Sequence, residues 1–486
     1  MKLTKLFDGF KYNVVLGNDE IEISKITDNT NDVSEDDVFF CIKGYNFDGH
    51  NFIDIVLSKG AKVIVINNDF ESKLPNDLDC VVISVDDTRK ALSIAAINFY
   101  GRLHEKFKII GVTGTNGKTT TTFILREIFK NAGFKTGIIG TISNFINDKK
   151  VKSERTTPGA LQLNELFNDM FKENVEYCFM EVSSHALELN RVYGIQFDYG
   201  VFTNLTQDHL DFHKNFSSYF DAKFKLFENS NKKIINNDDL YGKKIIEKID
   251  SNVITYGIEE IKSDFVAKDI EFKNDGTRFV VYDKFGKEYE FEYNLVGKFN
   301  IYNALPSIII ALNEGISVNV IRESLKNIFV AGRLENVSKK YNLDCDIYLD
   351  YAHTPDGLEN CLSTLKKISN GRIICVVGCG GDRDKEKRPL IGKIASELSD
   401  YVYITSDNPR SEDPEKIVQD IVSGIEKSNY EVVISRFDAI KKSIKNRKSS
   451  DIILIAGKGH EDYQILKDKV IHFDEREVID EILKEK

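Results

Sequence analysis

The feature that most constrains this sequence is a glycine-rich turn between a predicted buried strand and a predicted helix. It lies in the stretch Lys108-Ile-Ile-Gly-Val-Thr-Gly-Thr-Asn-Gly-Lys-Thr-Thr-Thr-Thr122. Apolar residues fill the strand, and the segment Phe123–Phe129 repeats apolar residues at helical spacing. Backbone N–H groups at the start of such a helix bind phosphate groups, and the helix dipole strengthens that binding. The turn therefore predicts a polyphosphate site.

Two residues of this turn have distinct predicted roles. The ammonium of Lys118 is expected to reach the terminal phosphates, and the hydroxyl of Thr119 is expected to bind Mg²⁺. The usual spacing has glycine where Val112 stands, so the turn is a variant of the phosphate-binding loop, and a turn that binds no phosphate is the alternative. We assign the phosphate contacts of ATP to Gly114, Thr115, Asn116, Gly117, Lys118, Thr119 and Thr120.

Length, charge and cysteine content limit the class of protein. A chain of 486 residues suggests about three domains of roughly 100 to 200 residues each. No run approaches the roughly 20 apolar residues of a membrane span, and we expect no secretory leader. A net charge of −11 argues against nucleic acid or an anionic membrane as partner. The seven cysteines are scattered, so we expect reduced core residues. We expect a cytoplasmic protein, because the N-terminus has no apolar run long enough for a secretory leader, and we expect a monomer.

The order of predicted strands and helices indicates three α/β domains. Residues 1–104 form a small N-terminal α/β domain. Residues 105–329 follow the pattern of a doubly wound sheet with its phosphate loop after an early strand, and the predicted strands are Phe107–Val112, Lys135–Gly140, Tyr177–Val182 and Tyr199–Asn204. An antiparallel meander is inserted between about 264 and 293, with turns at Asn274–Gly276 and Lys284–Lys287. Residues 330–486 repeat the doubly wound, Rossmann-like pattern without a phosphate loop, and the predicted strands are Ile347–Tyr351, Ile373–Val377, Tyr401–Thr405, Val432–Ser435 and Ile452–Ala456. We expect this last domain to bind a second substrate or to close over the first.

Polar residues follow the predicted strands of the central domain. A carboxylate at Glu181 and an imidazole at His209 could complete, with Thr119, the ligand shell of a hard cation that bridges ATP phosphates. A helix cap at Ser183 or Ser184 and a hydrogen-bonded turn histidine are the simpler alternatives. Farther on, Tyr219–Phe227 predicts an amphipathic helix in which Lys223 extends its ammonium to solvent.

Four loops of the C-terminal domain follow predicted strands at one edge of the sheet, which predicts a binding site there. Two of their residues, Arg383 and Arg410, can each bind a carboxylate through two hydrogen bonds. The loops are Asp350-Tyr-Ala-His-Thr-Pro355, Gly378-Cys-Gly-Gly-Asp-Arg-Asp384, Asp407-Asn-Pro-Arg410 and Gly457-Lys-Gly-His-Glu461.

Along essentially its whole length, the sequence resembles the Mur ligase family, and within it the UDP-N-acetylmuramoyl-tripeptide synthetases of peptidoglycan synthesis. The motifs that carry the resemblance are Gly114-Thr-Asn-Gly-Lys-Thr-Thr120, Thr156-Thr-Pro158, Glu181-Val-Ser-Ser-His-Ala-Leu187, Thr203-Asn-Leu-Thr-Gln-Asp-His-Leu-Asp211, Gly297-Lys-Phe-Asn-Ile-Tyr-Asn-Ala304, Asp350-Tyr-Ala-His-Thr-Pro355 and Asp407-Asn-Pro-Arg410.

The resemblance implies an ATP-dependent ligase. In such enzymes ATP phosphorylates the γ-carboxylate of D-glutamate in UDP-MurNAc-L-alanyl-D-glutamate, and the amine of an incoming amino acid attacks the acyl phosphate. Lys118 and Mg²⁺ would neutralise the charge of the moving phosphoryl group. The resemblance also implies that Lys223 is carbamylated and joins Thr119, Glu181 and His209 as a metal ligand, with Lys118, Glu181, His209 and Lys223 as the catalytic set.

Further binding roles are carried over from the resemblance. Asn303 is implied to contact adenine, while Arg333 and Asp350 are implied to help close the C-terminal domain on the nucleotide. The muramoyl-dipeptide is implied to contact Thr156, Thr157, Ser183 and Arg191. The uridine end is implied to contact Asn29, Tyr45, Asn46 and Phe47. The family commonly has Asp-Ser-Arg where this chain has Asp28-Asn29-Thr30.

The third-residue pocket indicates a diamino acid with a distal carboxylate. Asp-Asn-Pro-Arg is the family's mark of enzymes that use meso-2,6-diaminopimelate, whose distal carboxylate would meet Arg410 and Arg383 and whose distal amine would meet Glu461. Lysine would leave both arginines unpaired, at a cost of roughly 1–3 kcal/mol or more. The predicted contacts are Arg383, Asp407, Asn408, Pro409, Arg410, Gly457 and Glu461.

Several alternatives stay open on the sequence. The same ligase could take lanthionine, which has the same two ends as diaminopimelate, or L-lysine. A folylpolyglutamate-type ligase shares the phosphate loop, although the N-terminal domain with its loop Gly44–His50 favours a uridine nucleotide. A nucleotide-driven switch or transport ATPase would leave the four C-terminal loops without a role.

Overall fold

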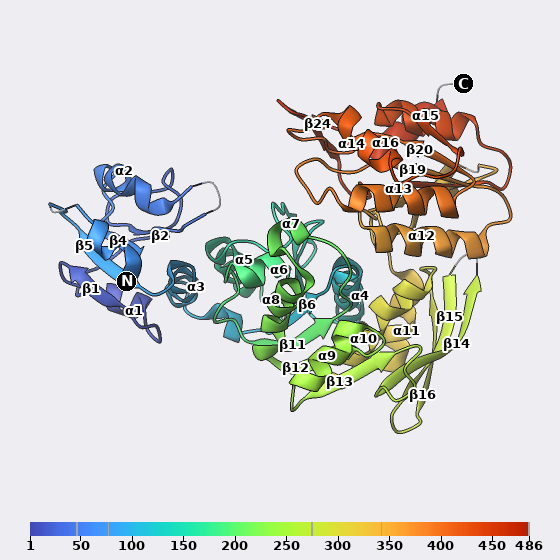
Figure 1. The fold of residues 1–486 in the computed structure, drawn as a ribbon. Helices are drawn as coiled ribbons and strands as arrows, with labels where there is room; N and C mark the ends of the chain where they lie inside the picture. The colour runs from blue at the N-terminus through green and yellow to red at the C-terminus, as the bar shows by residue number, and fades with distance from the viewer. Residues whose placement is uncertain (45–46, 76, 274–275, 342, 485–486) are drawn as a thin grey trace. The chain divides into compact units, whose positions relative to one another are not determined.

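The structure is a computed structural model that describes residues 1–44, 47–75, 77–273, 276–341 and 343–484 (Figure 1). The chain divides into two compact units. The first comprises residues 1–111, 134–200 and 222–232, and the second comprises residues 112–133, 201–221 and 233–486. The chain passes from one unit to the other at five points, and three of them lie within strands: β6 (Lys108–Thr113), β11 (Phe197–Phe202) and β12 (Ser230–Asn236).

The first unit begins with a five-stranded sheet whose strand order is β1-β5-β4-β3-β2. All its pairs are parallel except β1 with β5. Two apolar clusters, one containing Phe40 and the other Phe39, cover its faces because consecutive side chains of a strand point to opposite sides. This confirms the predicted small α/β fold. Its elements are α1 (Leu3–Leu6), β1 (Asn13–Leu16), β2 (Ile26–Thr27), β3 (Val38–Phe40), α2 (Ile53–Ser58), β4 (Val63–Asn67), β5 (Val81–Val85) and α3 (Thr88–Phe99).

The rest of the first unit contains the strand predicted at Tyr177–Val182, which is observed as β10 and ends at Glu181. In it β10 pairs in parallel with β7, which pairs antiparallel with β8, and β8 pairs with β9. The helix α5 packs against α3. The elements are β7 (Thr136–Ile139), β8 (Asn144–Ile146), β9 (Lys149–Val151), α5 (Ala160–Lys172), β10 (Tyr177–Glu181), α6 (Ser184–Glu188) and part of α8 (Phe216–Glu228).

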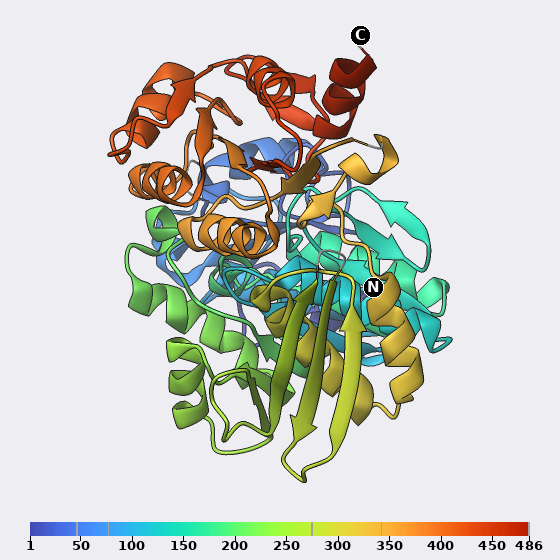
Figure 2. The same cartoon turned by 90° about the vertical axis from the view of Figure 1, so that its right-hand side faces the viewer.

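The second unit begins with α4 (Lys118–Asn131), which packs against α10 (Lys298–Asn313). The predicted meander is confirmed, because β15 pairs antiparallel with both β14 and β16; Figure 2 shows the three strands side by side in yellow-green. The first predicted turn, at 274–275, lies outside the described residues. The remaining elements are α7 (Leu210–His213), α9 (Leu240–Lys248), β13 (Val253–Gly257), β14 (Phe265–Lys273), β15 (Gly276–Asp283), β16 (Glu288–Tyr293) and α11 (Val318–Asn327).

The second unit ends in a six-stranded sheet of order β17-β18-β22-β19-β20-β21, parallel except at β17. One apolar cluster packs α12, α13 and α14 on one face, and another packs α15 and α16 on the other, so the predicted doubly wound pattern is confirmed. The elements are β17 (Glu335–Asn336), β18 (Asp346–Asp350), α12 (Pro355–Ile368), β19 (Ile373–Val377), α13 (Lys387–Leu398), β20 (Tyr401–Ile404), α14 (Pro414–Val422), β21 (Tyr430–Val432), α15 (Arg436–Lys445), β22 (Ile452–Ala456), β23 (Tyr463–Ile465), β24 (Val470–His472) and α16 (Glu475–Lys484).

One predicted strand of this sheet is misplaced. We predicted a strand at Val432–Ser435, whereas β21 runs from Tyr430 to Val432. The reason is the side chain of Ser435, which accepts a hydrogen bond from the N–H of Asp438 and so caps α15. A residue that begins a helix cannot also extend the preceding strand.

Two expectations drawn from composition can be compared with the structure. In the described part of the chain, no helix is both long enough and apolar enough to cross a membrane. All seven cysteines are free thiols, and six of them are buried while Cys80 is partly exposed. The prediction of reduced core cysteines is therefore confirmed.

The buried ion pair between α15 and α16 yields a stability prediction. Arg436 Nε lies 2.7 Å from Glu475 Oε1, and both side chains are fully buried. Glu475→Gln should lower the free energy of unfolding by about 3–5 kcal/mol, because it leaves a buried guanidinium without its counter-charge. Urea unfolding measures the change. Glu431→Gln, which removes the exposed partner of Lys442 on the same helix, should leave the midpoint nearly unchanged; equal effects of both variants would contradict this prediction.

Candidate functional site

The phosphate loop has the backbone shape that the sequence predicts. Gly117 has φ +90° and directly precedes α4, which begins at Lys118. A Cβ atom on Gly117 would lie 2.3 Å from Asn303 Oδ1, so only glycine fits. Lys118 Nζ donates to the carbonyl oxygens of Gly114 at 2.9 Å and Thr115 at 2.8 Å. The lysine therefore folds over the loop at the start of the helix.

The loop that follows β11 holds the phosphate loop in place. The N–H of Asn116 donates to Asn204 Oδ1 at 2.9 Å, and the hydroxyl of Thr203 donates to the carbonyl oxygen of Asn116 at 2.6 Å. Thr115 Oγ1 lies 3.1 Å from the hydroxyl oxygen of Tyr219. The motif from Thr203 to Asp211 thus supports the nucleotide loop, a role that its sequence alone did not reveal.

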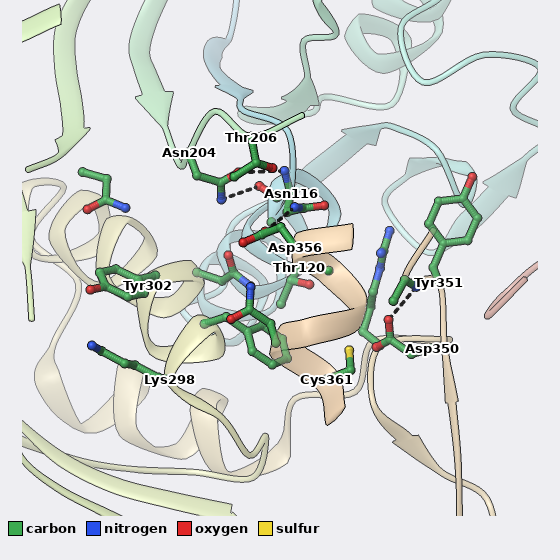
Figure 3. Close-up of a pocket in the computed structure, with 18 of the residues that line it drawn as sticks. Asn116, Thr120, Asn204, Thr206, Lys298, Tyr302, Asp350, Tyr351, Asp356 and Cys361 are labelled. Carbon is green, nitrogen blue, oxygen red and sulfur yellow. Dashed lines mark hydrogen bonds between the residues drawn. The ribbon is translucent and has the colours of Figure 1, made fainter. Parts of the chain in front are cut away.

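A cavity of 310 Å³ opens beside the phosphate loop, and the C-terminal part of the second unit forms its other wall. Figure 3 shows Asn116 and Asp356 pointing toward each other, with Asn116 Nδ2 donating to Asp356 Oδ2 at 2.8 Å. Arg333 Nη2 donates to Thr119 Oγ1 at 3.2 Å. Of the predicted ATP residues, the cavity brings together Asn116, Gly117, Thr120, Asn303, Arg333 and Asp350.

Buried carboxyl groups dominate the electrostatics of this cavity. Burial raises the pKa of Asp350, whose oxygens accept from the N–H groups of Leu334 at 2.6 Å and Ala352 at 2.7 Å. Burial also raises the pKa of Asp356. At Asp238 burial opposes ionisation, but backbone N–H donors and the hydroxyl of Tyr302, at 2.6 Å, outweigh it and lower the pKa. The cavity is also lined by three residues that are not among the predicted ATP contacts: Asp238, Tyr302 and Asp356.

A second group that sequence reasoning missed centres on Asp208. Its carboxylate is buried and lies 3.4 Å from Lys387 Nζ, 3.3 Å from His209 Nε2 and 3.8 Å from His353 Nε2. Burial would raise the pKa of Asp208, but the neighbouring histidine and lysine side chains hold that pKa well below its ordinary value. Because Lys387 and His353 are more than 140 positions away in the sequence, no local pattern could have joined them to Asp208.

Within the first unit, the structure brings together the residues predicted for the muramoyl-dipeptide. Thr157 Oγ1 donates to the carbonyl oxygen of Glu181 at 2.8 Å and to Ser183 Oγ at 3.2 Å, while Arg191 Nη1 donates to the carbonyl oxygen of Thr157 at 2.9 Å. Thr156 Oγ1 lies 3.0 Å from the hydroxyl of Thr141, which itself donates to Glu181 Oε2. The expected cap at Ser183 is also present, since its side chain accepts from Ala186.

Positive charge gathers near this group. Burial, with the charges of Arg155 and Arg89, lowers the pKa of Arg191 to about 10. Three guanidinium groups close enough to repel one another favour an anionic ligand. The signal in the sequence for this positive charge is Arg155, which directly precedes Thr156.

The structure describes two of the four predicted uridine contacts, Asn29 and Phe47. Asn29 is exposed, and its side chain bonds Asp32 and the N–H of Asn31 within its own turn. Phe47 is 73% exposed. Tyr45 and Asn46 lie outside the described residues. The uridine assignments therefore stay predictions.

The C-terminal loops place the predicted amino-acid residues close together. Asn408 Nδ2 donates to Glu461 Oε2 at 2.9 Å, and the carbonyl oxygen of Asn408 accepts from Arg410 at 3.5 Å. Burial and the positive charge of Arg383 lower the pKa of Arg410. Asp407 lies against Gly457, where a Cβ atom would be 2.6 Å from Asp407 Oδ2. Pro409 is buried beside them.

The predicted metal ligands come from both units, so their common site stays a prediction. Thr119 and His209 belong to the second unit, whereas Glu181 and Lys223 belong to the first. Among the described residues, no group of three or more His, Cys, Asp or Glu side chains could hold a metal ion. The interpretation of Lys223 as a lysine that reaches solvent is wrong: it is 1% exposed, because it lies on the packed side of α8 and not at its edge.

Comparison with known proteins agrees with this geometry. Three family models match: the Mur ligase family catalytic domain at residues 22–100, the Mur ligase middle domain at 112–311 and the Mur ligase glutamate ligase domain at 332–459. A protein of Clostridium botulinum named UDP-N-acetylmuramoyl-L-alanyl-D-glutamate–2,6-diaminopimelate ligase is 51% identical over 486 residues, which is all of both chains. The chain belongs to the Mur ligase family.

Solved structures place this Mur ligase in the same fold. A structure titled UDP-N-acetylmuramoyl-L-alanyl-D-glutamate–2,6-diaminopimelate ligase is 28% identical with a TM-score of 0.66, and the match covers 95% of each chain. A folylpolyglutamate synthase of Mycobacterium tuberculosis is 16% identical with a TM-score of 0.64 over 76% of this chain and 93% of its own, which shows a shared fold alone. The predicted three-domain α/β architecture is thereby confirmed.

The phosphate loop yields a prediction with a matched control. Gly117→Ala should weaken ATP binding at least about tenfold, because the new methyl group displaces Asn303 from the loop. Gly133 follows the same helix, has a similar φ of +96° and has no atom within 4 Å of its would-be Cβ. Both variants should cost about 1–2 kcal/mol of stability through left-handed strain. Calorimetric titration with ATP distinguishes them, and equal ATP affinities would contradict the assignment.

Proposed function

We propose that this Mur ligase joins meso-2,6-diaminopimelate to the D-glutamate of UDP-N-acetylmuramoyl-L-alanyl-D-glutamate, at the expense of ATP, in peptidoglycan synthesis. One observation carries the proposal: the second unit contains both a phosphate loop beside a cavity and a loop cluster that holds Arg410 near Arg383 and Glu461. The 51% identical relative, aligned over its whole length, is named for the same two substrates.

The chemistry follows from charge. A carboxylate and ATP are both anions, so their reaction requires cationic groups and N–H donors around the moving phosphoryl group. Lys118, Arg333 and the N-terminus of α4 supply these in the second unit. The γ-carboxylate oxygen attacks the γ-phosphorus and ADP leaves. The free amine of the amino acid then attacks the acyl carbon, phosphate leaves, the amine loses a proton, and an amide remains.

The muramoyl-dipeptide fits the first unit best. Arg191, with Arg155 and Arg89 nearby, supplies positive charge for a pyrophosphate or carboxylate. Thr156, Thr157 and Ser183 supply hydroxyl groups beside Glu181. We propose that the uridine end of this substrate contacts Asn29 and Phe47.

The third residue is set by the C-terminal loops. Because Arg410 is partly buried and repelled by Arg383, a carboxylate between them relieves both costs. Diaminopimelate carries such a carboxylate at its distal end together with an amine that suits Glu461. Lanthionine offers the same two groups, whereas L-lysine offers only the amine.

We further propose Mg²⁺ as the cation that accompanies ATP, held through the hydroxyl of Thr119, which faces Arg333 in the cavity wall. When bound, Mg²⁺ withdraws charge from the phosphate oxygens. The burial of Lys223 supports its proposed carbamylation, since a carbamate replaces a buried ammonium by a metal-ligating carboxylate. We propose that the protein is a monomer in the cytoplasm.

A requirement for all three substrates tests this function. With purified protein and Mg²⁺, phosphate release should need ATP, the UDP-muramoyl-dipeptide and diaminopimelate together, because the acyl phosphate forms only on the dipeptide and is resolved only by the amine. A switch or transport ATPase would release phosphate from ATP alone. A folylpolyglutamate-type ligase would need a folate in place of the dipeptide, and either result would overturn the proposal.

The proposed carbamate yields a rescue prediction. Lys223→Ala should lose most ligase activity, on the order of 10–100-fold, which is the loss seen when a group that supports a metal site is removed. Millimolar short-chain carboxylic acids should restore part of the activity, because they supply the missing carboxylate. Lys225→Ala, which removes an exposed lysine paired with Glu188 on the same helix, should keep full activity. A Lys223→Ala enzyme with the ligase activity of the wild type would contradict the proposed carbamate.

A further inference from the structure

Lys458 is a fully buried cation in the amino-acid loops, and the function proposed above gives it no role. It follows β22 after Gly457, whose φ of +116° turns the chain inward. Its exposed fraction is 0%. Lysines are almost never buried to this extent unless a partner compensates the charge.

The contacts of Lys458 converge on the groups predicted to bind the amino acid. Its Nζ lies 3.0 Å from Glu461 Oε2 and 3.3 Å from Asn408 Oδ1. Asn408 also donates to the same Glu461 oxygen at 2.9 Å, and its own Oδ1 accepts from the N–H of Ile465 at 2.9 Å. Glu461 is thus fixed by two donors, one of which is charged.

Tyr463 closes this cluster, which comprises Lys458, Asn408, Glu461 and Tyr463. The ammonium of Lys458 lies 5.4 Å from the centre of the Tyr463 ring, a cation–π distance. Burial and the nearby Glu461 carboxylate raise the pKa of the Tyr463 phenol to about 12. The phenol therefore stays neutral, and Lys458 and Glu461 are the charged members of the cluster.

The charge of Glu461 is already offset within these loops. Lys458 Nζ lies 3.0 Å from its carboxylate, and Arg410 is attracted by Asp407 and Glu461 and repelled by Arg383. A ligand end that carries both a carboxylate and an ammonium can pair with Arg410 and with Glu461. A lone ammonium leaves Arg410 without an anion and meets a Glu461 whose charge Lys458 already offsets.

We propose that Lys458 is a positioning residue that aims the carboxylate of Glu461 and a charge filter that rejects amino acids with a lone distal ammonium. The inference rests on the proposed function, because it assumes that a diamino acid binds at these loops. It assigns the preference against L-lysine to Lys458 as well as to the unpaired arginines.

The test uses two variants and a control. Lys458→Met removes both the charge and the donor, and Lys458→Gln keeps a donor in the buried position if the Met variant does not fold. Lys467→Met removes an exposed lysine a few residues away. Each full-length enzyme receives ATP, the UDP-muramoyl-dipeptide and a mixture of diaminopimelate and L-lysine, and the ratio of the two products is measured by mass.

Both Lys458 variants should lower the preference for diaminopimelate over lysine by about tenfold. The Met variant should in addition raise the KM for diaminopimelate, with the KM for ATP unchanged in both. A merely structural role would move the KM for ATP as well. Folded Lys458 variants with the product ratio of the wild type and of Lys467→Met would overturn the inference. If the wild type joins neither amino acid to the dipeptide, the proposed function has failed instead.

Discussion

The second unit depends on contacts between the phosphate loop and residues more than 200 positions farther along the chain. Arg333 reaches Thr119, and Asn116 reaches Asp356. The cavity exists because these two segments face each other. Glycine at position 117 allows the approach, since a side chain there would overlap Asn303. Any change that keeps these segments apart would leave a phosphate loop without the far wall of its site.

Charged side chains cluster at each of the proposed substrate sites. Asp208 is held by a lysine and two histidines, Arg191 is surrounded by other arginines in the first unit, and Arg410 is set beside Arg383. The carboxylate of Asp208 stabilises positive charge on its neighbours. In each of the two arginine clusters the guanidinium groups repel one another, and a bound anion would offset that repulsion. This division matches a reaction in which two anionic substrates and a zwitterion are handled by separate loops.

Local sequence patterns predicted the helices and strands better than the contacts between them. The β-branched runs of β19 and β22 gave strands at the residues expected, and the glycine turn gave the phosphate loop. The burial of Lys223 was missed because helical spacing shows which residues share a face and not what covers that face. Asp356 and Asp208 were missed for a related reason, since their partners lie far away in the sequence. The predicted roles of Thr157 and Arg191 came from the resemblance to the Mur ligases, because no periodicity in the sequence points to them.

The central claim is that the dipeptide carboxylate is phosphorylated before the amide forms. The measurement that tests it most directly uses UDP-muramoyl-dipeptide labelled with ¹⁸O in the γ-carboxylate of its glutamate. When both carboxylate oxygens are labelled, each phosphate released during ligation with ATP and diaminopimelate should carry one ¹⁸O atom. The reason is that one carboxylate oxygen leaves with the phosphoryl group when the amide forms. Phosphate without ¹⁸O, formed together with the amide product, would contradict the account.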